Sequence, residues 1–486
     1  MNRQIRMLGG LLMALFALLF IQLNNLQVIR AAKLNNDPRN TRQAIKDFSR
    51  KRGTIVAADG TILAQSSPVD DQFKFQRTYP QGKLFSGVVG SFSFTFGSTG
   101  AEAAFGDDLA SNRSLGDQLL GADREVVSNV TLTLRAGLQK VAMDQLGDKK
   151  GSVVALDPRT GAILAMYSNP SIDLSPLADH DQTKGRAFFD ALKANKDKPD
   201  LNRAFRERFP PGSTFKVVTA TAAVQQAPDL ATKTYPVLRS LPLPQTKGQT
   251  LSNFGGSSCG GVLPDLLRVS CNTGFAQMGL DLGADRLSSQ ASAFGFNAKP
   301  PIDLPGVASA IFPGAEAFAR DLPGLAKSAI GQQDVSATPL EMALIAGALG
   351  NGGRMMVPHV LADVRDESGT VVRTFSPKPW QPTGRDATTP DVASQIRDFM
   401  VGVVRNGTGT RAQISGVTVA GKSGTAQTTG DLANAWFIAF APAEAPTVAV
   451  AVIVEGQPGV SGGDNQTGGR VAAPIARAIL LAALGK

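Results

Sequence analysis

Apolar residues follow one another without a charge over a long stretch near the start of the chain. Arg3 and Arg6 precede an apolar or small run from Met7 to Ile21, and uncharged residues continue to Ile29. This length is close to the ~20 residues that a helix needs to cross a bilayer. It also exceeds the usual apolar length of a cleaved signal peptide, so we expect an uncleaved membrane anchor. The two arginines predict a cytoplasmic N-terminus, which leaves the rest of the chain outside the cytoplasm.

The next hundred residues predict a small, mostly extended region. Residues 30–50 are polar, as is typical of a stalk. The segment 52–66 (RGTIVAADGTILAQS) predicts a β-hairpin, because two β-rich runs flank Asp59-Gly60. From there to about residue 129 the chain is rich in Gly, Ser and Phe and lacks a strong helical period.

The longer C-terminal part predicts strands at its two ends and helices between them. A helical pattern over 131–147 precedes a strand pair with a turn at 157–161. The other expected helices are 214–225, 260–279, 339–349 and 471–486, and the β-rich runs near the end are 417–428, 435–442 and 447–456. This order predicts an α+β domain with one antiparallel sheet and helices packed on its faces.

The amino-acid composition helps to decide which class of molecule the chain binds. The chain has 486 residues, 43% of them hydrophobic and 18% charged, which suits a globular protein of more than one domain. A net charge of +9 suits anionic lipid, cell-wall polymer or nucleic acid. The chain has no Lys/Arg run, zinc-finger spacing or stacking-aromatic motif, so we do not expect nucleic acid as a partner.

A serine and a lysine stand one helical turn apart in the stretch RFPPGSTFK. Ser213 and Lys216 form the one Ser-x-x-Lys of the chain, and residues three apart share a face of a helix. A helix beginning at or near Ser213 would offer free N–H groups to a developing oxyanion. A serine hydroxyl needs a base to become a nucleophile, and burial or a nearby cation can make lysine such a base. Taken alone, the pair fits an N-cap serine followed by a solvated lysine better than a catalytic pair.

Two further motifs follow in the same region. Ser270-Cys271-Asn272 is the one Ser-x-Asn of the chain, and it can supply a second hydroxyl and an amide. Lys422, Ser423, Gly424 and Thr425 follow a strand-like run, where the glycine permits close approach of another backbone and the lysine and hydroxyls suit a carboxylate. Each alone fits a loop, a cap or an edge strand.

Together, in this order and in one extracytoplasmic domain, the three motifs resemble the signature set of penicillin-binding proteins and serine β-lactamases. The segments RGTIVAADGTILAQS, SVVALDPRTGAILAMYSNPSID and AIGQQDVSATPLEMALIAGALGNGG are similar to those of class B penicillin-binding proteins over most of the chain after residue 50. The short N-terminal region, the length and the stretch VSCNT most resemble the penicillin-binding protein A group of actinobacteria.

This resemblance implies a mechanism on peptidoglycan stem peptides, with penicillins and other β-lactams acylating the same serine. Ser213 would attack the carbonyl between two D-alanines, Lys216 would take its proton, and the N–H groups of Ser213 and Thr425 would hold the oxyanion. The resemblance assigns proton relay to Ser270 and Lys422, the substrate amide to Asn272, and the terminal carboxylate to Lys422, Ser423, Gly424 and Thr425. An amine from a neighbouring stem peptide would then open the acyl-enzyme.

The resemblance also implies an organisation: residues 1–6 in the cytoplasm, an anchor over 7–29, a non-catalytic pedestal or dimerisation domain over 30–130, and a transpeptidase domain over 131–486. Class B relatives work with a membrane glycosyltransferase that polymerises glycan, so we expect such a partner. No cofactor is implied.

Other functions share some of these sequence features. A D,D-carboxypeptidase differs in its acceptor alone, while a β-lactamase or a membrane-anchored β-lactam sensor shares the motifs. A Ser-His-Asp hydrolase and a metal site are disfavoured, because the two histidines, His180 and His359, lie in no recognisable motif. Cys259 and Cys271 can form one disulfide in an oxidising compartment or remain two buried thiols.

Overall fold

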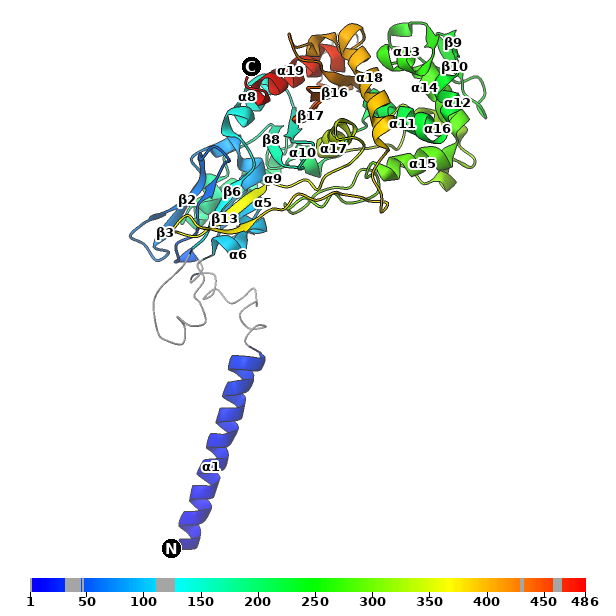
Figure 1. Ribbon diagram of the computed structural model, residues 1–486. Coiled ribbons are helices and arrows are strands. Elements are labelled where there is room, and N and C mark those ends of the chain that lie inside the picture. The colour runs from blue at the N-terminus through cyan, green and yellow to red at the C-terminus, as the bar shows by residue number, and fades with distance from the viewer. Residues whose placement is uncertain (1, 31–44, 46–47, 111–126, 429–431, 458–465) are drawn as a thin grey trace. The chain divides into compact units, whose positions relative to one another are not determined.

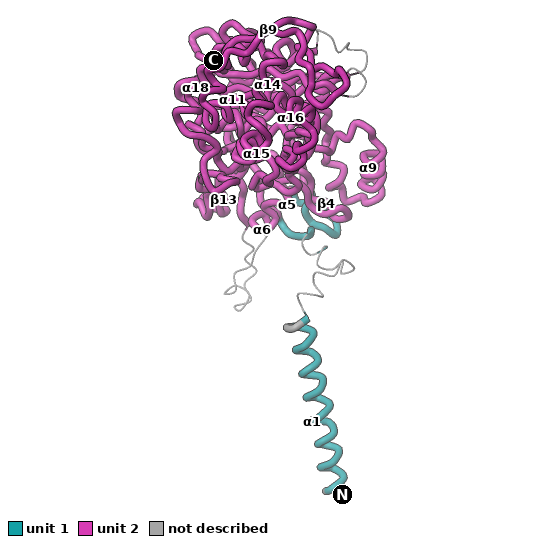
Figure 2. The backbone as a smooth tube through the Cα atoms, turned by 90° about the vertical axis from the view of Figure 1, so that its right-hand side faces the viewer, with its two compact units in different colours: residues 1–51, 67–76 teal, residues 52–66, 77–486 magenta. Residues whose placement is uncertain are grey.

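The computed structural model describes residues 2–30, 45, 48–110, 127–428, 432–457 and 466–486 (Figure 1). Most of the predicted stalk lies outside these residues. Contacts within the chain separate two compact units, one formed by residues 1–51 and 67–76 and the other by residues 52–66 and 77–486 (Figure 2).

The first unit contains the predicted anchor. Helix α1 (Asn2–Asn24) continues into a π-helix, η1 (Asn25–Ile29). The stretch Arg3–Gln27 is long and apolar enough to cross a membrane, and within the described residues no other helix is. Its large apolar side chains are exposed, with Met13 at 76%. A helix that is apolar all round and that no other described residue buries fits a single-pass membrane anchor.

The second unit is built on a five-stranded antiparallel sheet in the order β15-β16-β17-β7-β8. The strands are β7 (Gly151–Leu156), β8 (Ile163–Asn169), β15 (Ala420–Gln427), β16 (Ala433–Ala441) and β17 (Val448–Val454). The two strands from the start of the domain thus pair with the three from its end, as the sequence predicted. β15 is an edge strand, so one of its sides is open to another partner.

Helices cover both faces of this sheet. Along β16, Ile438 joins the core beneath α17 (Pro339–Gly350), while its neighbour Phe437 joins the core beneath α8 (Ala136–Leu146) and α19 (Ala473–Ala483). Successive strand residues point to opposite faces, so a strand buried on both faces is apolar at every position. This explains the uninterrupted run VAVAVIV of β17, and Figure 1 shows the sheet between the two helical layers.

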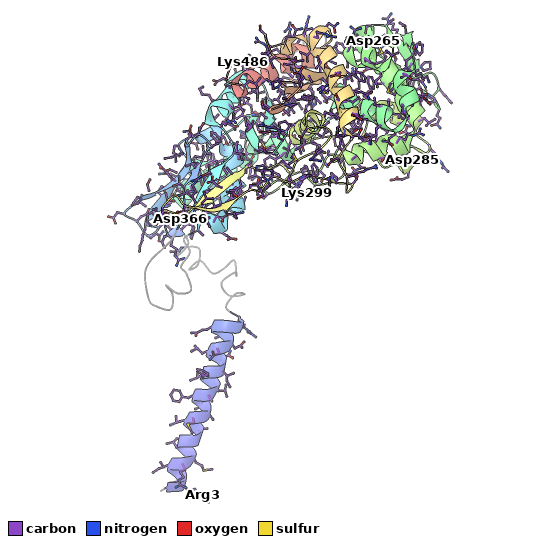
Figure 3. All side chains as sticks on the ribbon, viewed as in Figure 1. Arg3, Asp265, Asp285, Lys299, Asp366 and Lys486 are labelled. Carbon is purple, nitrogen blue, oxygen red and sulfur yellow. A yellow bond between two sulfur atoms is a disulfide. The ribbon has the colours of Figure 1, made fainter. Side chains whose placement is uncertain are left out.

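Further helices extend the unit beyond the β15 edge. In Figure 3, Asp265 marks α13 and Asp285 marks α15 in this part. These helices are α11 (Lys216–Gln226), α12 (Pro228–Thr232), α13 (Leu263–Arg268), α14 (Asn272–Leu282), α15 (Ala284–Ala293) and α16 (Leu322–Ser328). α18 (Pro390–Asn406) packs against β15 and α13, α10 (Arg203–Arg206) packs against β7 and β8, and α9 (Gln182–Ala194) follows β8 in the chain. Short two-stranded pairs β9 (Tyr235–Leu238) with β12 (Cys259–Gly261), and β10 (Ser240–Pro242) with β11 (Thr250–Ser252), lie beside α14.

A second sheet has the order β14-β13-β6-β1-β2-β3. Its strands are β1 (Ile55–Val56), β2 (Ile62–Pro68), β3 (Phe75–Thr78), β6 (Asn129–Leu132), β13 (Leu361–Arg365) and β14 (Val371–Thr374). β1 and β2 confirm the predicted hairpin. The region is less extended than predicted, since besides the pair β4 (Phe92–Ser93) and β5 (Gly97–Ser98) it contains the short helices α4 (Ser86–Val89), α5 (Gly100–Ala104) and α6 (Gly106–Leu109).

Two predicted helices differ from the structure. The segment predicted as one helix over 131–147 begins as strand β6 and becomes helical at Ala136. The segment predicted as one helix over 260–279 is two helices, α13 and α14, broken at Ser270, whose φ of 60° is left-handed. A left-handed residue cannot continue a right-handed helix, so the chain turns there.

Candidate active site

The Ser213 motif spans a tight turn and the start of a helix. Gly212 to Phe215 form a 3-10 turn, and α11 begins at Lys216, two residues after the start of the helix expected over 214–225. Gly212 has a φ of 54°, and its N–H donates to the carbonyl of Gly331 at 2.8 Å. The turn leaves Ser213 partly exposed and buries Lys216 completely. Among the described residues, the Ser213 hydroxyl makes no hydrogen bond.

Lys216 reaches the second motif. Its Nζ donates to the carbonyl oxygen of Ser270 and to Oδ1 of Asn272, both at 2.7 Å, and lies 3.4 Å from Ser270 Oγ. Burial, and then the charge of Lys422, hold the pKa of Lys216 well below its ordinary value. A neutral lysine amine has two N–H groups and one lone pair. The two close acceptors use the N–H groups and leave the lone pair to accept a proton.

The left-handed backbone of Ser270 aims its carbonyl at Lys216. Its N–H donates to the carbonyl of Leu267 at 3.2 Å, and the N–H of Cys271 donates to that of Leu266 at 2.8 Å. This pair of bonds closes the C-terminus of α13 in a Schellman motif, where glycine is the usual left-handed residue. A serine there costs roughly 1 kcal/mol or more, so the fold holds a strained backbone at this motif.

Lys422 approaches the same hydroxyl from the edge strand. Its Nζ donates to Ser270 Oγ at 2.9 Å and to the carbonyl of Ser423 at 2.7 Å. Complete burial lowers the pKa of Lys422 to about 7. Ser270 Oγ therefore lies between two lysine nitrogens, Lys216 and Lys422, that both lose their protons more readily than ordinary lysines.

The other third-motif residues bring β15 against the Ser213 turn. A β-carbon at Gly424 would lie 2.9 Å from Thr214 Cγ2 and 3.0 Å from the carbonyl oxygen of Pro211, so only glycine permits this approach. Ser423 Oγ shares a 2.7 Å hydrogen bond with Thr408 Oγ1. Thr425 Oγ1 accepts from a backbone N–H at 3.4 Å. The Ser213 turn and the edge strand are thus in direct contact.

The Ser-x-Asn motif is tied to the segment before it. The structure joins Cys259 and Cys271 in a disulfide, with a Cα–Cα distance of 5.8 Å. Asn272 Nδ2 donates to the carbonyl of Ser252 at 3.1 Å, which turns its Oδ1 toward Lys216.

Sequence reasoning missed two residues behind these motifs, Asn253 and Thr408. Neither lies in a recognisable pattern, and each acts on a motif at least 14 positions away along the chain. In the described part of the chain, no group of three or more His, Cys, Asp or Glu could hold a metal ion.

The chain is similar to known proteins in both sequence and fold. The family model of the penicillin binding protein transpeptidase domain matches residues 151–481, and that of the penicillin binding protein A dimerisation domain matches residues 52–125. The chain is 39% identical to the peptidoglycan D,D-transpeptidase PbpA of Mycolicibacterium smegmatis and 38% identical to that of Mycobacterium tuberculosis. Each alignment covers 100% of this chain and 99% of the relative.

The solved structures agree. Penicillin-binding protein A from M. tuberculosis, as a ceftriaxone acyl-enzyme complex, matches with a TM-score of 0.82 and 36% identity over 90% of this chain and 100% of that one. Its penicillin G acyl-enzyme complex matches with a TM-score of 0.80 over the same shares. With these matches, and with the three motifs gathered around Ser270 Oγ, the chain belongs to the penicillin-binding protein transpeptidase family.

Proposed function

We propose that this chain is a peptidoglycan D,D-transpeptidase that cross-links stem peptides through an acyl-enzyme on Ser213 and that β-lactams acylate the same serine. The observation that carries the proposal is the placement of Ser270 Oγ between the buried nitrogens of Lys216 and Lys422, at 3.4 and 2.9 Å. Two amines with lowered pKa values around one hydroxyl form a proton relay that needs no histidine or metal. The named activity of the mycobacterial relatives and their acyl-enzyme complexes support the same reaction.

In the first half of the reaction, Ser213 Oγ attacks the carbonyl carbon between the two terminal D-alanines while neutral Lys216 accepts the hydroxyl proton. The oxyanion is held by the backbone N–H groups of Ser213 and Thr425. The peptide C–N bond then breaks, and the proton passes through Ser270 and Lys422 to the leaving amine of D-Ala.

In the second half, a stem-peptide amine attacks the ester carbonyl, the ester C–O bond breaks, and the amine proton returns to Ser213 Oγ. Before acylation, Asn272 holds the substrate amide, and Lys422 with Ser423, Gly424 and Thr425 binds the terminal carboxylate of the D-Ala that will leave. The open side of β15 suits an extended peptide or a β-lactam lying alongside the strand.

The test compares Ser213→Ala with Ser368→Ala, which changes an exposed serine in the distant turn between β13 and β14. We expect a fluorescent penicillin to label wild type and Ser368→Ala and to leave Ser213→Ala unlabelled. Labelling of Ser213→Ala would overturn the nucleophile assignment.

A product analysis separates the related activities. Purified protein incubated with nascent peptidoglycan is expected to yield cross-linked dimers. Trimmed monomers without dimers would assign a D,D-carboxypeptidase, and rapid release of hydrolysed penicillin would assign a β-lactamase. Stable labelling without any peptidoglycan product would favour a β-lactam sensor.

We further propose that the N-terminus is cytoplasmic and the catalytic domain extracytoplasmic. Arg3 and Arg6, at the N-terminal end of the apolar helix α1, support this orientation. From the resemblance to class B penicillin-binding proteins we also propose the division into residues 1–6, 7–29, 30–130 and 131–486. The same resemblance supports contact with a membrane glycan-polymerising glycosyltransferase through the anchor and residues 30–130.

A further inference from the structure

The carboxamide of Asn253 is buried between the Ser-x-Asn motif and the segments around it. The residue is 5% exposed. Its Oδ1 accepts the backbone N–H groups of Asn272 at 2.9 Å and Thr273 at 3.0 Å. Its Nδ2 donates to the carbonyls of Leu238 at 2.8 Å and Ser257 at 3.1 Å. Both ends of the amide are therefore satisfied, and one side chain joins three separate pieces of backbone.

The side chain of Asn253 caps the N-terminus of α14, because the N-cap residue of that helix does not. The first N–H groups of a helix have no partner within the helix, and a side chain at the N-cap position usually accepts them. The N-cap residue of α14 is Cys271, which makes no such bond and whose sulfur is in the disulfide with Cys259. The acceptor comes instead from a residue 19 positions earlier in the chain, Asn253.

The cap holds Asn272, the residue whose side chain contacts Lys216, the proposed base. Asn272 Oδ1 accepts from Lys216 Nζ at 2.7 Å, and Asn272 Nδ2 donates to the carbonyl of Ser252, the chain neighbour of Asn253. The backbone of Asn272 is thus fixed by the Asn253 side chain, and its carboxamide is oriented by the Asn253 backbone segment. If this carboxamide turned over, an NH₂ group would face the lysine nitrogen in place of an oxygen.

We propose that Asn253 is a positioning residue for the acylation of Ser213, a role that rests on the proposed function. By capping α14, Asn253 fixes where Asn272 and Ser270 stand, and so where the Lys216 lone pair points when Ser213 attacks. Asn253 does not touch the substrate. It acts on the acylation step through Lys216, and its effect on the initial noncovalent binding of the β-lactam through Asn272 is the smaller one.

The experiment uses the full-length protein and a chromogenic cephalosporin, and it separates the acylation rate constant from the noncovalent dissociation constant. Asn253→Ala is compared with Asn202→Ala, a matched control. Asn202 is 3% exposed, accepts a helix-start N–H from Ala204 at 3.0 Å and donates to the carbonyl of Gly87 at 2.6 Å, yet touches none of the three motifs. Both variants remove a buried cap of about 1 kcal/mol, so both lower the melting temperature.

We expect Asn253→Ala to lower the acylation rate constant roughly 10- to 100-fold with little change in the dissociation constant, as for a misplaced catalytic group. Asn202→Ala should stay near wild type in both constants. Equal losses in the two variants, or a loss confined to the dissociation constant, would overturn the proposal, as would a folded Asn253→Ala that acylates at the wild-type rate.

Asn253→Asp provides a second measurement. Aspartate keeps an acceptor for the two N–H groups of α14 but turns its other oxygen toward the carbonyls of Leu238 and Ser257. We expect it to retain an acylation rate constant within roughly threefold of wild type, whether or not Asn253→Ala folds. A larger loss in a folded Asn253→Asp contradicts a role based on the cap. If wild type itself is not acylated, or Ser213→Ala is, the proposed function fails instead of this inference.

Discussion

The acylation rate of Ser213 is expected to rise with pH, and replacing Lys422 with methionine should move this acid limb of the pH–rate profile to higher pH. In the proposed mechanism, Lys216 must be neutral to accept the Ser213 proton, so we expect the acylation rate to rise as the pH passes through the pKa of Lys216. That pKa is lowered first by burial and then by the charge of Lys422. Removing the cation removes its repulsion of the protonated form, which raises the pKa of Lys216.

The distances bound the size of the effect. Both nitrogens lie near Ser270 Oγ, at 3.4 and 2.9 Å, so Lys216 Nζ and Lys422 Nζ are no more than about 6.3 Å apart. At that separation and an effective dielectric constant of about 20, two unit charges repel by roughly 2.6 kcal/mol. The coupling operates only where Lys422 is protonated, below its pKa of about 7. At this largest separation the full repulsion corresponds to a shift of roughly two pH units, and a shorter separation would give a larger one.

The assay is the acylation rate constant for a chromogenic cephalosporin from pH 5 to 9. Lys422→Arg is the matched variant, because it keeps the charge at every pH. Both variants should lower the plateau, since Ser270 Oγ loses the amine that donates to it at 2.9 Å. Only Lys422→Met should shift the limb upward. A limb that stays in place or moves to lower pH in Lys422→Met would refute the coupling.

Two other substitutions test a buried hydrogen bond next to the site and a buried carboxyl group in the core. Trp436 is fully buried and its indole N–H donates to the carbonyl of Pro210 at 3.0 Å, so Trp436→Phe should cost about 1–3 kcal/mol of stability by leaving that carbonyl unpaired. It should also slow acylation, and unchanged melting and acylation would contradict this role. Glu341 is fully buried with neither carboxyl oxygen hydrogen-bonded, and burial raises its pKa well above its ordinary value. The unfolded chain therefore binds fewer protons than the folded one above about pH 4.5, so stability falls as pH rises toward the folded pKa, by about 1.4 kcal/mol per pH unit. Glu341→Gln should melt higher than wild type by a margin that grows with pH in this window, and a margin independent of pH would contradict the assignment.

The sequence predicted the central sheet well because its strands are buried on both faces. The run VAVAVIV in β17 is seven residues long and rich in β-branched side chains, and both features favour a buried strand over a buried helix. Helix α17 was equally clear, since Thr338 and Pro339 mark its start and Asn351 its end. The hairpin of β1 and β2 followed from Asp59-Gly60.

The remaining features depend on contacts that no local pattern reveals. Ser270 breaks the predicted helix although serine carries no turn signal comparable to glycine, because Lys216 binds the carbonyl that the left-handed backbone presents. Motif order predicted which residues to examine, but the placement of Ser270 Oγ between two lysines required the fold. Asn253 had no signal, since a lone asparagine followed by Phe254 and two glycines is typical of an ordinary loop.

The pairing of β13 with β6 has a practical consequence for anyone who wants to express the catalytic part alone. The matched transpeptidase segment, residues 151–481, carries β13 and β14, but their partner β6 (Asn129–Leu132) and the strand beyond it, β1 (Ile55–Val56), lie before it. In a protein that begins at residue 151, the backbone groups of β13 that pair with β6 would lose their partners. The side chains of Leu361 and Val364, now buried, would lose part of their cover, and such an edge strand favours aggregation. Soluble recombinant material should therefore begin before Arg52, with the anchor as the piece to remove.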